Sequence, residues 1–321
     1  STKKTLITAD MTDVNVVFLI SIFIVAIGYF IKRLGLIKEE NGDVIAKIIF
    51  NVTLPAVILK FTSTIQFELS LILLPLVNIA FGLGMAAIGI LSFRKRSDRL
   101  KGAMIMTMIG FNIAHFFFPL VEGIWGAAGM HYITLVDAGN AFTIFVLCYI
   151  IASLYSPKNH EKGVRFDYKF ILKRLIKSVP LMSYVAALTI NFLGFTIPII
   201  FSDLIDVFAK ANTALALLLL GIFLNFEFGK AEWISIIKVL VLRYALGLFV
   251  GLLLFFLLPT SIFDPLFRII ICLSLILPVG LAVILFSVEY DYDQEFVAMI
   301  VNLSIIISFG LIWILILILG V

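Results

Sequence analysis

Apolar residues fill long uninterrupted segments of the chain, and short polar segments separate them. About twenty apolar residues in a helix cross a hydrocarbon core roughly 30 Å thick. Backbone groups find no water partners in lipid, so each such segment must be helical. We therefore predict ten membrane-spanning helices, at residues 14–31, 44–61, 69–93, 102–126, 130–154, 179–195, 204–226, 236–258, 265–288 and 296–319.

The longest polar segment, residues 156–178, divides the predicted spans into five and five. In its second half, Tyr168, Ile171, Leu172 and Leu175 recur at the spacing of one helical face, and lysines occupy the other side. This pattern predicts an interfacial helix on the cytoplasmic surface. The chain then comprises a first five-helix repeat at residues 1–155, this linker at 156–178, and a second five-helix repeat at 179–321.

Five is an odd number, so two related halves of five spans each would lie in opposite orientations, as in inverted-repeat transporters. A weak internal similarity supports this arrangement. The segment NVTLPA begins at Asn51 in span two, and NTALAL begins at Asn212 in span seven. Spans four and nine each carry a proline near mid-membrane, Pro119 and Pro278.

Lys and Arg residues in the short loops predict the orientation, because cytoplasmic loops carry the excess. Loops that follow odd-numbered spans hold sixteen of them, and the opposite side holds three, Lys60, Lys210 and Arg268. Both termini are therefore predicted on the extracytoplasmic side of a plasma or inner membrane. The sixteen are Lys32, Arg33, Lys38, Arg94, Lys95, Arg96, Arg99, Lys101, Lys158, Lys162, Arg165, Lys169, Lys173, Arg174, Lys177 and Lys230.

Composition supports the membrane prediction. Apolar residues make up 62% of the 321 residues and charged residues 14%, against roughly 45–50% and 25% in soluble domains. The basic residues of the +4 chain lie between apolar segments, so we expect no nucleic-acid partner. The sequence lacks HExxH, GxSxG and P-loop motifs, so we predict neither an enzyme nor a cofactor.

Proline removes a backbone donor and disrupts the preceding helical turn. We predict that span four breaks between Asn112 and Pro119, and span nine between Leu277 and Gly280, a segment that includes Pro278 and Val279. The freed backbone groups at such breaks can bind ions or anionic substrates. The alternative interpretation is that both prolines only kink continuous helices.

Ionisable residues inside membrane spans are candidates for function. Asp137 and Asn140 share a face of span five, Glu122 follows Pro119, and His115 is the one histidine deep in a span. Asp137 either takes part in transport or forms a structural ion pair, for example with Arg243 of span eight. His115 either contacts a proton or substrate or only packs, and Glu122 either couples to transport or reaches outer water.

The chain resembles the auxin efflux carrier family, which includes bacterial malate and malonate permeases and plant PIN-type auxin exporters. In the first repeat the resemblance rests on GYFIKRLGLIKEE (28–40), FNVTLPAVIL (50–59), Asn112 seven residues before Pro119, and the Asp137/Asn140 pair. In the second repeat it rests on ALALLLLGIFL (214–224) and LPVGLAVILFSVEYDYD (277–293). His115 and Phe116–Phe118 depart from the small residues that the family commonly has there.

This resemblance implies a ten-helix fold similar to sodium/proton antiporters and bile-acid symporters. Spans one, two, six and seven would form a scaffold that often dimerises, and spans three to five and eight to ten would form a moving transport domain. Spans four and nine would cross at their breaks, where Asn112, Pro119 and Pro278 match the family's crossover positions. The implied substrates are small organic anions, moved by a proton gradient or the membrane potential.

From these features we predict a secondary active transporter, working as an elevator, for a small organic anion such as malate. Its site would comprise Asn112, His115, Pro119, Asp137, Asn140, Pro278, Val279 and Gly280, with His115, Asp137 and Glu122 as candidates for coupling. The alternative is a cation/proton antiporter on the same architecture, and a membrane receptor or channel is a third hypothesis. We expect a homodimer in the lipid bilayer, driven by protons as the coupling ion or by the membrane potential.

Overall fold

A computed structural model describes residues 11–156, 168–225 and 232–320, and every regular element in these ranges is helical. Seven helices in this part of the chain are long and apolar enough to cross a membrane. Two shorter apolar helices accompany them, Val179–Phe192 and Pro265–Ser274. The prediction of an all-helical integral membrane protein is therefore confirmed at this level.

The elements follow the predicted spans closely. The largest differences are at the starts of spans two and seven. Their helices begin at Glu39 and at Ile199, each five residues before the predicted start, and Ile199 directly follows Pro198. The N-terminal half contains α1 (Met11–Arg33), α2 (Glu39–Ile48), η1 (Ile49–Thr53), α3 (Leu54–Thr62), η2 (Leu69–Ile72), α4 (Leu73–Ser92), α5 (Asp98–Met108), η3 (Ile113–Phe117), α6 (Phe118–Phe142), η4 (Thr143–Cys148) and α7 (Tyr149–Leu154). The C-terminal half contains α9 (Tyr168–Lys177), α10 (Val179–Phe192), α11 (Ile199–Phe223), α12 (Trp233–Leu257), α13 (Pro265–Ser274), α14 (Ala282–Glu289) and α15 (Gln294–Leu319).

Helical residues run without a gap from Ile113 to Leu154, over 42 residues. At 1.5 Å per residue a straight helix of that length would measure roughly 63 Å, about twice the thickness of a hydrocarbon core. Gly126 interrupts it with φ 56° and ψ −142°, a conformation that glycine adopts readily. This kink lies where the sequence predicts the end of span four.

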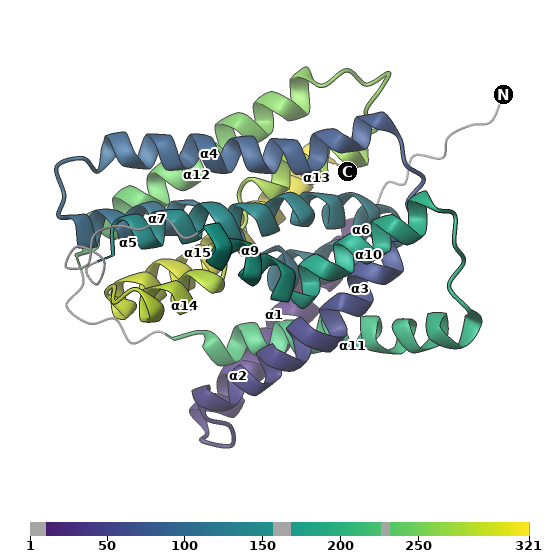
Figure 1. The fold of residues 1–321 in the computed structure, drawn as a ribbon, viewed down its shortest axis with the longest axis horizontal. Helices are drawn as coiled ribbons and strands as arrows, with labels where there is room; N and C mark the ends of the chain where they lie inside the picture. Colours follow the sequence, from purple (N-terminus) through teal and green to yellow (C-terminus); the bar gives the residue numbers. More distant parts are fainter. Residues whose placement is uncertain (1–10, 157–167, 226–231, 321) are drawn as a thin grey trace.

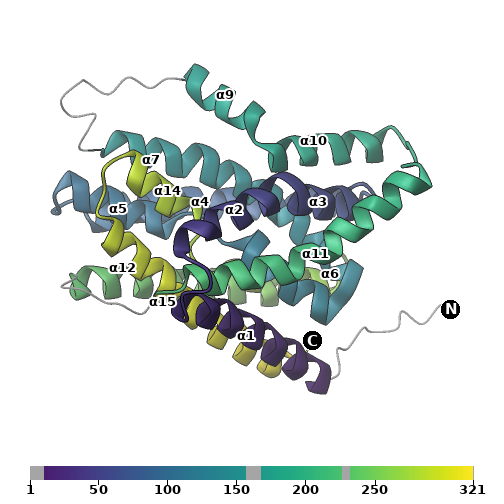
Figure 2. The same cartoon turned by 90° about the horizontal axis from the view of Figure 1, so that it is seen from below.

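The helices pack as two groups. The first group contains α1, α2, α3, α10 and α11, and α11 contacts each of α1, α2 and α3. The second group contains α4 to α7 and α12 to α15, with α4 packed on α6 and α12 packed on α5 and α13. Figure 1 displays both groups with their long helices lying mainly along the same direction. In Figure 2, α1 lies beside α15, where the rings of Phe18 and Trp313 stack.

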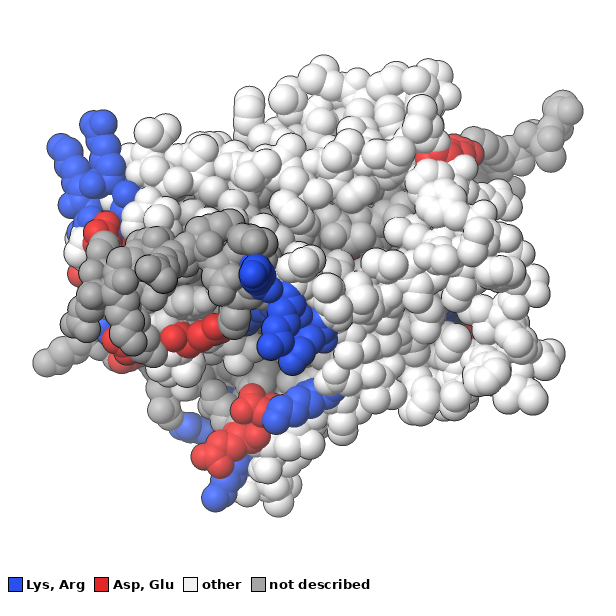
Figure 3. Space-filling view, viewed as in Figure 1, with Lys and Arg blue, Asp and Glu red and all other residues white. Residues whose placement is uncertain are grey.

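Charged residues gather toward one end of the molecule. In Figure 3, Lys and Arg side chains cluster on the left, and most of the remaining visible surface carries no charge. Large apolar side chains such as Phe23, Ile200 and Phe256 are also exposed. Exposed apolar surface of this kind suits contact with lipid.

The predicted interfacial helix corresponds to α9, whereas residues 157–167 of the polar segment lie outside the described residues. Leu172 and Ile176 of α9 are exposed. Arg174 donates to Glu289 of α14 at 3.0 Å, so α9 is tied to the second group as well as to α10, which follows it in sequence.

Two of the predicted spans are interrupted. The first interruption, in span four, lies at residues 109–112, not between Asn112 and Pro119 as predicted. The second interruption, in span nine, lies at residues 275–281, between α13 and α14, and includes the predicted Leu277–Gly280 segment. The turn of the first interruption forms at Gly110, whose φ is +75°. Pro119 instead lies inside the helical run, directly after the π-helical turn η3, and such a turn is one way in which a helix accommodates a local disruption of its hydrogen bonds.

Candidate functional site at two interrupted helices

The two interruptions meet in the interior of the second group. The backbone N–H of Asn112 donates to the carbonyl of Pro278 at 2.9 Å. A Cβ added to Gly280 would lie 3.3 Å from the Phe111 carbonyl and 3.0 Å from Ile144. Gly280 therefore lets the second interruption approach the first, and both lie among buried residues.

Asn140 holds the first interruption in place. Its side-chain Oδ1 accepts the backbone N–H of Phe111, and its Nδ2 donates to the carbonyl of the same residue, each at 2.9 Å. A buried backbone group without a partner is costly, so this paired contact stabilises the non-helical turn. The sequence analysis assigns Asn140 to substrate binding, and in this structure its amide is engaged by the backbone.

Side chains of α12 and α15 hold the second interruption. Ser304 accepts the N–H of Val279 at 2.9 Å, and Ser308 donates to the carbonyl of Ile276 at 2.8 Å. Tyr244 donates its hydroxyl to the carbonyl of Ser304 at 2.7 Å. The sequence analysis does not identify these serines, because serine is common in membrane helices as a packing residue.

Arg243 of α12 reaches both interruptions and is fully buried. Its Nη1 donates to the carbonyl of Met108 at 2.7 Å, and its Nη2 donates to those of Gly110 and Leu277, both at 2.9 Å. Its guanidinium also lies 4.5 Å from the ring centre of Phe111. The suggested ion pair between Asp137 and Arg243 is wrong, because backbone carbonyls occupy the guanidinium.

Asp137 joins the two groups of helices. Tyr184 of α10 donates its hydroxyl to Asp137 Oδ2 at 2.8 Å, and Asn140 Nδ2 lies 3.3 Å from Oδ1. Both Tyr184 and Asp137 are buried. The carboxyl group of Asp137 thus lies between α6 of the second group and α10 of the first.

Asn112, His115 and Arg243 each have a side-chain nitrogen that these contacts leave unused, and in Arg243 it is Nε. The first two are neutral side chains next to the first interruption in the sequence. Both side chains are 3% exposed, and neither Asn112 Nδ2 nor His115 Nε2 has a hydrogen-bond partner among the described residues. His115 packs edge-on against Phe50 of η1, with ring centres 5.0 Å apart. Helix N-termini in general have N–H groups without intrahelical partners and a partial positive charge, and η3 begins at Ile113, between these two residues in the chain. We therefore treat this corner as the candidate site.

Two further polar contacts connect segments that the sequence singles out. Between the two groups, Thr213 of α11 donates to Glu122 of α6 at 2.7 Å, and Glu122 is half-buried. Within the first group, Thr53 donates to Asn212 at 2.9 Å. This bond joins the NVTLPA and NTALAL segments, which the sequence analysis pairs as equivalents in the two repeats.

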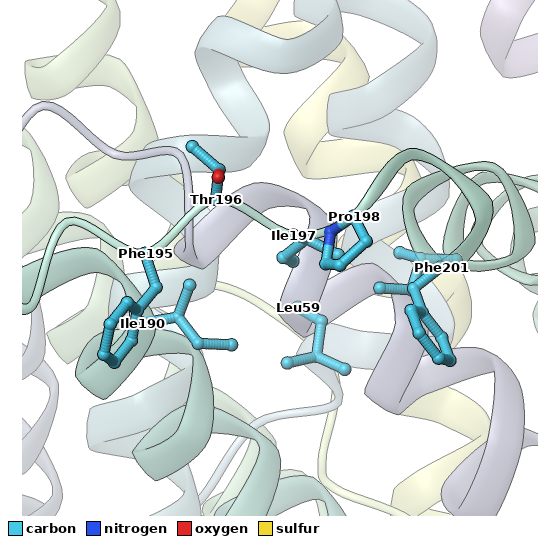
Figure 4. A pocket seen from close by; sticks show the side chains of 8 residues that line it. Leu59, Ile190, Phe195, Thr196, Ile197, Pro198 and Phe201 are labelled. Carbon is cyan, nitrogen blue, oxygen red and sulfur yellow. The ribbon is translucent and has the colours of Figure 1, made fainter.

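An apolar cavity of about 300 Å³ lies elsewhere, between the ends of α3, α10 and α11. Figure 4 shows Leu59, Ile190 and Phe201 pointing into it, with Thr196 as a polar side chain on its lining. None of the predicted site residues lines this cavity. Its lining offers little to bind a charged substrate, so the interrupted helices remain the candidate site.

Comparisons with known proteins agree on the type of molecule. A family model described as membrane transport protein matches residues 14–316. An uncharacterized transporter of Methanocaldococcus jannaschii, MJ1031, is 26% identical over 223 residues, which cover 65% of this chain and 68% of that protein. An uncharacterized transporter of Methanothermobacter thermautotrophicus is 26% identical over 212 residues, covering 64% of this chain and 66% of its own length.

Proposed function

The chain belongs to the membrane transport protein family, the auxin efflux carrier family, and on that premise we propose that it is a secondary active transporter of a small organic anion. Malate is the representative substrate. The observation that carries the proposal is the meeting of two interrupted helices beside two buried polar atoms, Asn112 Nδ2 and His115 Nε2, that find no partner in the described part of the chain. In transporters, helix N-termini at such breaks bind anionic groups.

The proposed topology has ten spans in two inverted five-helix repeats. Seven helices are long enough to cross a membrane, and the kink at Gly126 divides one of them, residues 113–154, into two spans. The shorter helix α10 adds one span, and α13 and α14 together add one interrupted span, which makes ten. The bond between Asn112 and Pro278 joins equivalent interruptions of the two proposed repeats. The gathering of Lys and Arg at one end of the molecule favours the cytoplasmic assignment of that end, with both termini on the other side.

The proposed mechanism is an elevator, in which the second group of helices slides along the first. The first group, from spans one, two, six and seven, would be the scaffold. In Figure 1, α5 and α7 of the second group extend further toward the charged end than α2 of the scaffold and α9 of the linker. Such an offset is expected when the transport group is displaced toward the cytoplasm. The Tyr184–Asp137 and Thr213–Glu122 contacts would break and re-form during movement.

An anion suits the site better than a cation. Asn112 Nδ2 is a buried hydrogen-bond donor without a partner among the described residues, and an anion can accept from it. Asp137 is the one buried carboxylate among the described residues, and Tyr184 and Asn140 already engage it. A cation/proton antiporter would need an available carboxylate at the crossing, the place where the two interruptions meet. This alternative is therefore less well supported. The tight packing of the crossing, with Asn112 and His115 buried, also disfavours an open channel.

His115, Asp137 and Glu122 are the proposed coupling groups, with protons or the membrane potential as the driving force. We further propose a homodimer in a plasma or inner membrane, formed through the scaffold. Exposed apolar residues on α10 and α11, including Val185, Leu204 and Val207, supply a surface for such contact or for lipid.

Ligand-dependent thermal unfolding of the purified protein provides the first test, with a panel of mono- and dicarboxylates. A substrate stabilises the folded state by mass action, so we expect a small dicarboxylate to raise the unfolding temperature with saturation. In parallel, a pH-sensitive dye inside proteoliposomes reports cation/proton exchange on addition of Na⁺, K⁺ or Li⁺. Dye responses to these cations without stabilisation by any carboxylate would replace the anion proposal with the antiporter.

A further inference from the structure

Arg243 is unusual among buried charges because it has no carboxylate partner in the described part of the chain. Its partners are carbonyl oxygens from the end of α5 and from the two interruptions. Nη1 donates to Thr107 and Met108 of α5, at 3.4 and 2.7 Å, and Nη2 donates to Gly110, Leu277 and Pro278, at 2.9, 2.9 and 3.2 Å. An isolated buried charge is costly to desolvate. Something else in the site must therefore compensate it.

Helix ends supply that compensation. The last carbonyls of a helix lack intrahelical partners, and each C-terminus carries a partial charge of about −0.5. The carbonyls of Thr107 and Met108 belong to the last turn of α5, which ends at Met108. Those of Leu277 and Pro278 follow the end of α13 at Ser274 by three and four residues. Together these carbonyls surround the guanidinium with partial negative charge.

The packing of α12 brings the guanidinium to this point. Gly247 lies one turn after Arg243, and a Cβ there would collide with the carbonyl of Leu275. Gly251 approaches the carbonyl of Cys272 in the same way, at 2.8 Å for an added Cβ. The absence of side chains at these two positions lets α12 lie directly against α13 and the second interruption.

Carbonyl oxygens from unwound helix segments are the ligands with which transporters bind Na⁺. From this geometry we propose that Arg243 occupies a cation site made by the carbonyls of Met108, Gly110, Leu277 and Pro278, and serves as a built-in cation. The wild-type protein then needs no bound metal cation to hold its interruptions together. Loss of the guanidinium would leave a site for a small monovalent cation.

Thermal unfolding in detergent tests this proposal, in chloride salts of Na⁺, K⁺ or N-methyl-D-glucamine at one ionic strength. The wild-type protein should unfold at the same temperature in all three. Arg243→Ala should unfold lower by roughly 5–10 °C in N-methyl-D-glucamine, a loss of several kcal/mol for a chain of this size. Millimolar guanidinium or Na⁺ should restore part of that loss in a saturable way.

Arg268→Ala is the matched control. Arg268 lies on α13, and its Nη1 donates to one carbonyl, that of Phe255, outside the crossing. Its removal also deletes a guanidinium, but neither guanidinium nor Na⁺ should restore what that variant loses. Equal restoration of both variants would mean that the ions act on the protein generally, and it would overturn the proposal.

Arg243→Lys and Arg243→Gln keep the proposal testable if Arg243→Ala does not fold. Lysine retains the charge with fewer donors, and glutamine retains donors without the charge. A built-in cation predicts that the Lys variant unfolds at a higher temperature than the Gln variant and remains insensitive to Na⁺. A Gln variant as stable as the Lys variant, or wild-type protein stabilised by Na⁺, would contradict it.

This inference concerns the site in the proposed function, but its experiments measure stability and not transport. Cation-insensitive Arg243 variants would leave carboxylate binding and uptake by the wild-type protein untouched. Conversely, absence of carboxylate binding would leave the role of Arg243 standing as a property of the crossing itself.

Discussion

Asn112 donates its backbone N–H to the carbonyl of Pro278 across 2.9 Å, and these residues are 166 positions apart in the chain. The bond uses the backbone of Asn112 and leaves its side-chain Nδ2 without a partner in the described residues. One residue can therefore hold the two interruptions together and still present a donor to a ligand.

Asn112→Ala removes that donor and leaves the backbone bond in place. We expect substrate affinity to fall about tenfold, because a net hydrogen bond is worth about 0.5–1.5 kcal/mol and about 1.4 kcal/mol is one decade. Titration of thermal stability with the substrate measures this loss. The control is Asn191→Ala, whose amide bonds Ser63 and Ile65 away from the crossing, and it should lose stability but keep affinity. The reverse pattern would move the site away from Asn112.

His115→Gln tests proton coupling. Glutamine cannot take up or release a proton as an imidazole can, so we expect this change to flatten the pH dependence of transport if His115 carries the coupled proton. The half-buried His131, which contacts Thr64 at 3.3 Å, supplies the control variant His131→Gln with an unchanged profile. If His115 only packs against Phe50, its variant will instead unfold at a lower temperature with the pH profile intact.

Much of the fold follows from the hydrophobic pattern, because the backbone groups of a long apolar segment in lipid must form their hydrogen bonds within a helix. The second interruption is also predictable, because Pro278 and Gly280 lie within it. The first is not, because the turn depends on the positive φ of Gly110, and glycine is frequent in membrane helices without such a role. Pro119 is the more obvious sequence signal in this segment, but it lies seven residues after Asn112, the last residue of the interruption.

The candidate site is predictable only in part, for a related reason. The sequence identifies Asn112, His115, Asp137 and Asn140 as polar residues in spans, but not which partners they have. Asn140 faces the backbone of Phe111, and Asp137 faces Tyr184. These pairings depend on the rotation of each helix about its axis, which packing between helices decides. Arg243 is likewise visible as an intramembrane charge, whereas its carbonyl partners come from residues distant in the chain.

Single cysteines test the proposed orientation. Both native cysteines, Cys148 and Cys272, are buried and should react little with impermeant thiol reagents. Ser97 and Ser261 are exposed in loops at opposite ends of the spans. In intact cells we expect Ser261→Cys to react and Ser97→Cys to react only after permeabilisation. Labelling of Ser97→Cys from outside would contradict both the charge rule and the inverted repeats.

A reversible cross-link tests the elevator. Trp313 of α15 donates its indole N–H to Asn15 of α1 across the two groups at 2.8 Å, and neither residue belongs to the proposed site. Cysteines at these two positions, joined by a short bifunctional reagent, should therefore stop transport, and cleavage of the linker should restore it. The matched pair Ser63→Cys and Asn191→Cys lies within the scaffold, where Asn191 bonds the Ser63 carbonyl, and its cross-link should leave transport unchanged. Full activity with positions 15 and 313 joined would rule out sliding of α15 past α1.

Uptake of radiolabelled malate and related carboxylates into proteoliposomes tests the central claim most directly, with and without an imposed pH gradient or membrane potential. We predict saturable uptake of at least one small carboxylate, accelerated by one of these gradients and reduced in liposomes carrying Asn112→Ala. Liposomes without protein provide the background. No uptake of any carboxylate above that background, by protein that is folded and correctly inserted, would contradict the account.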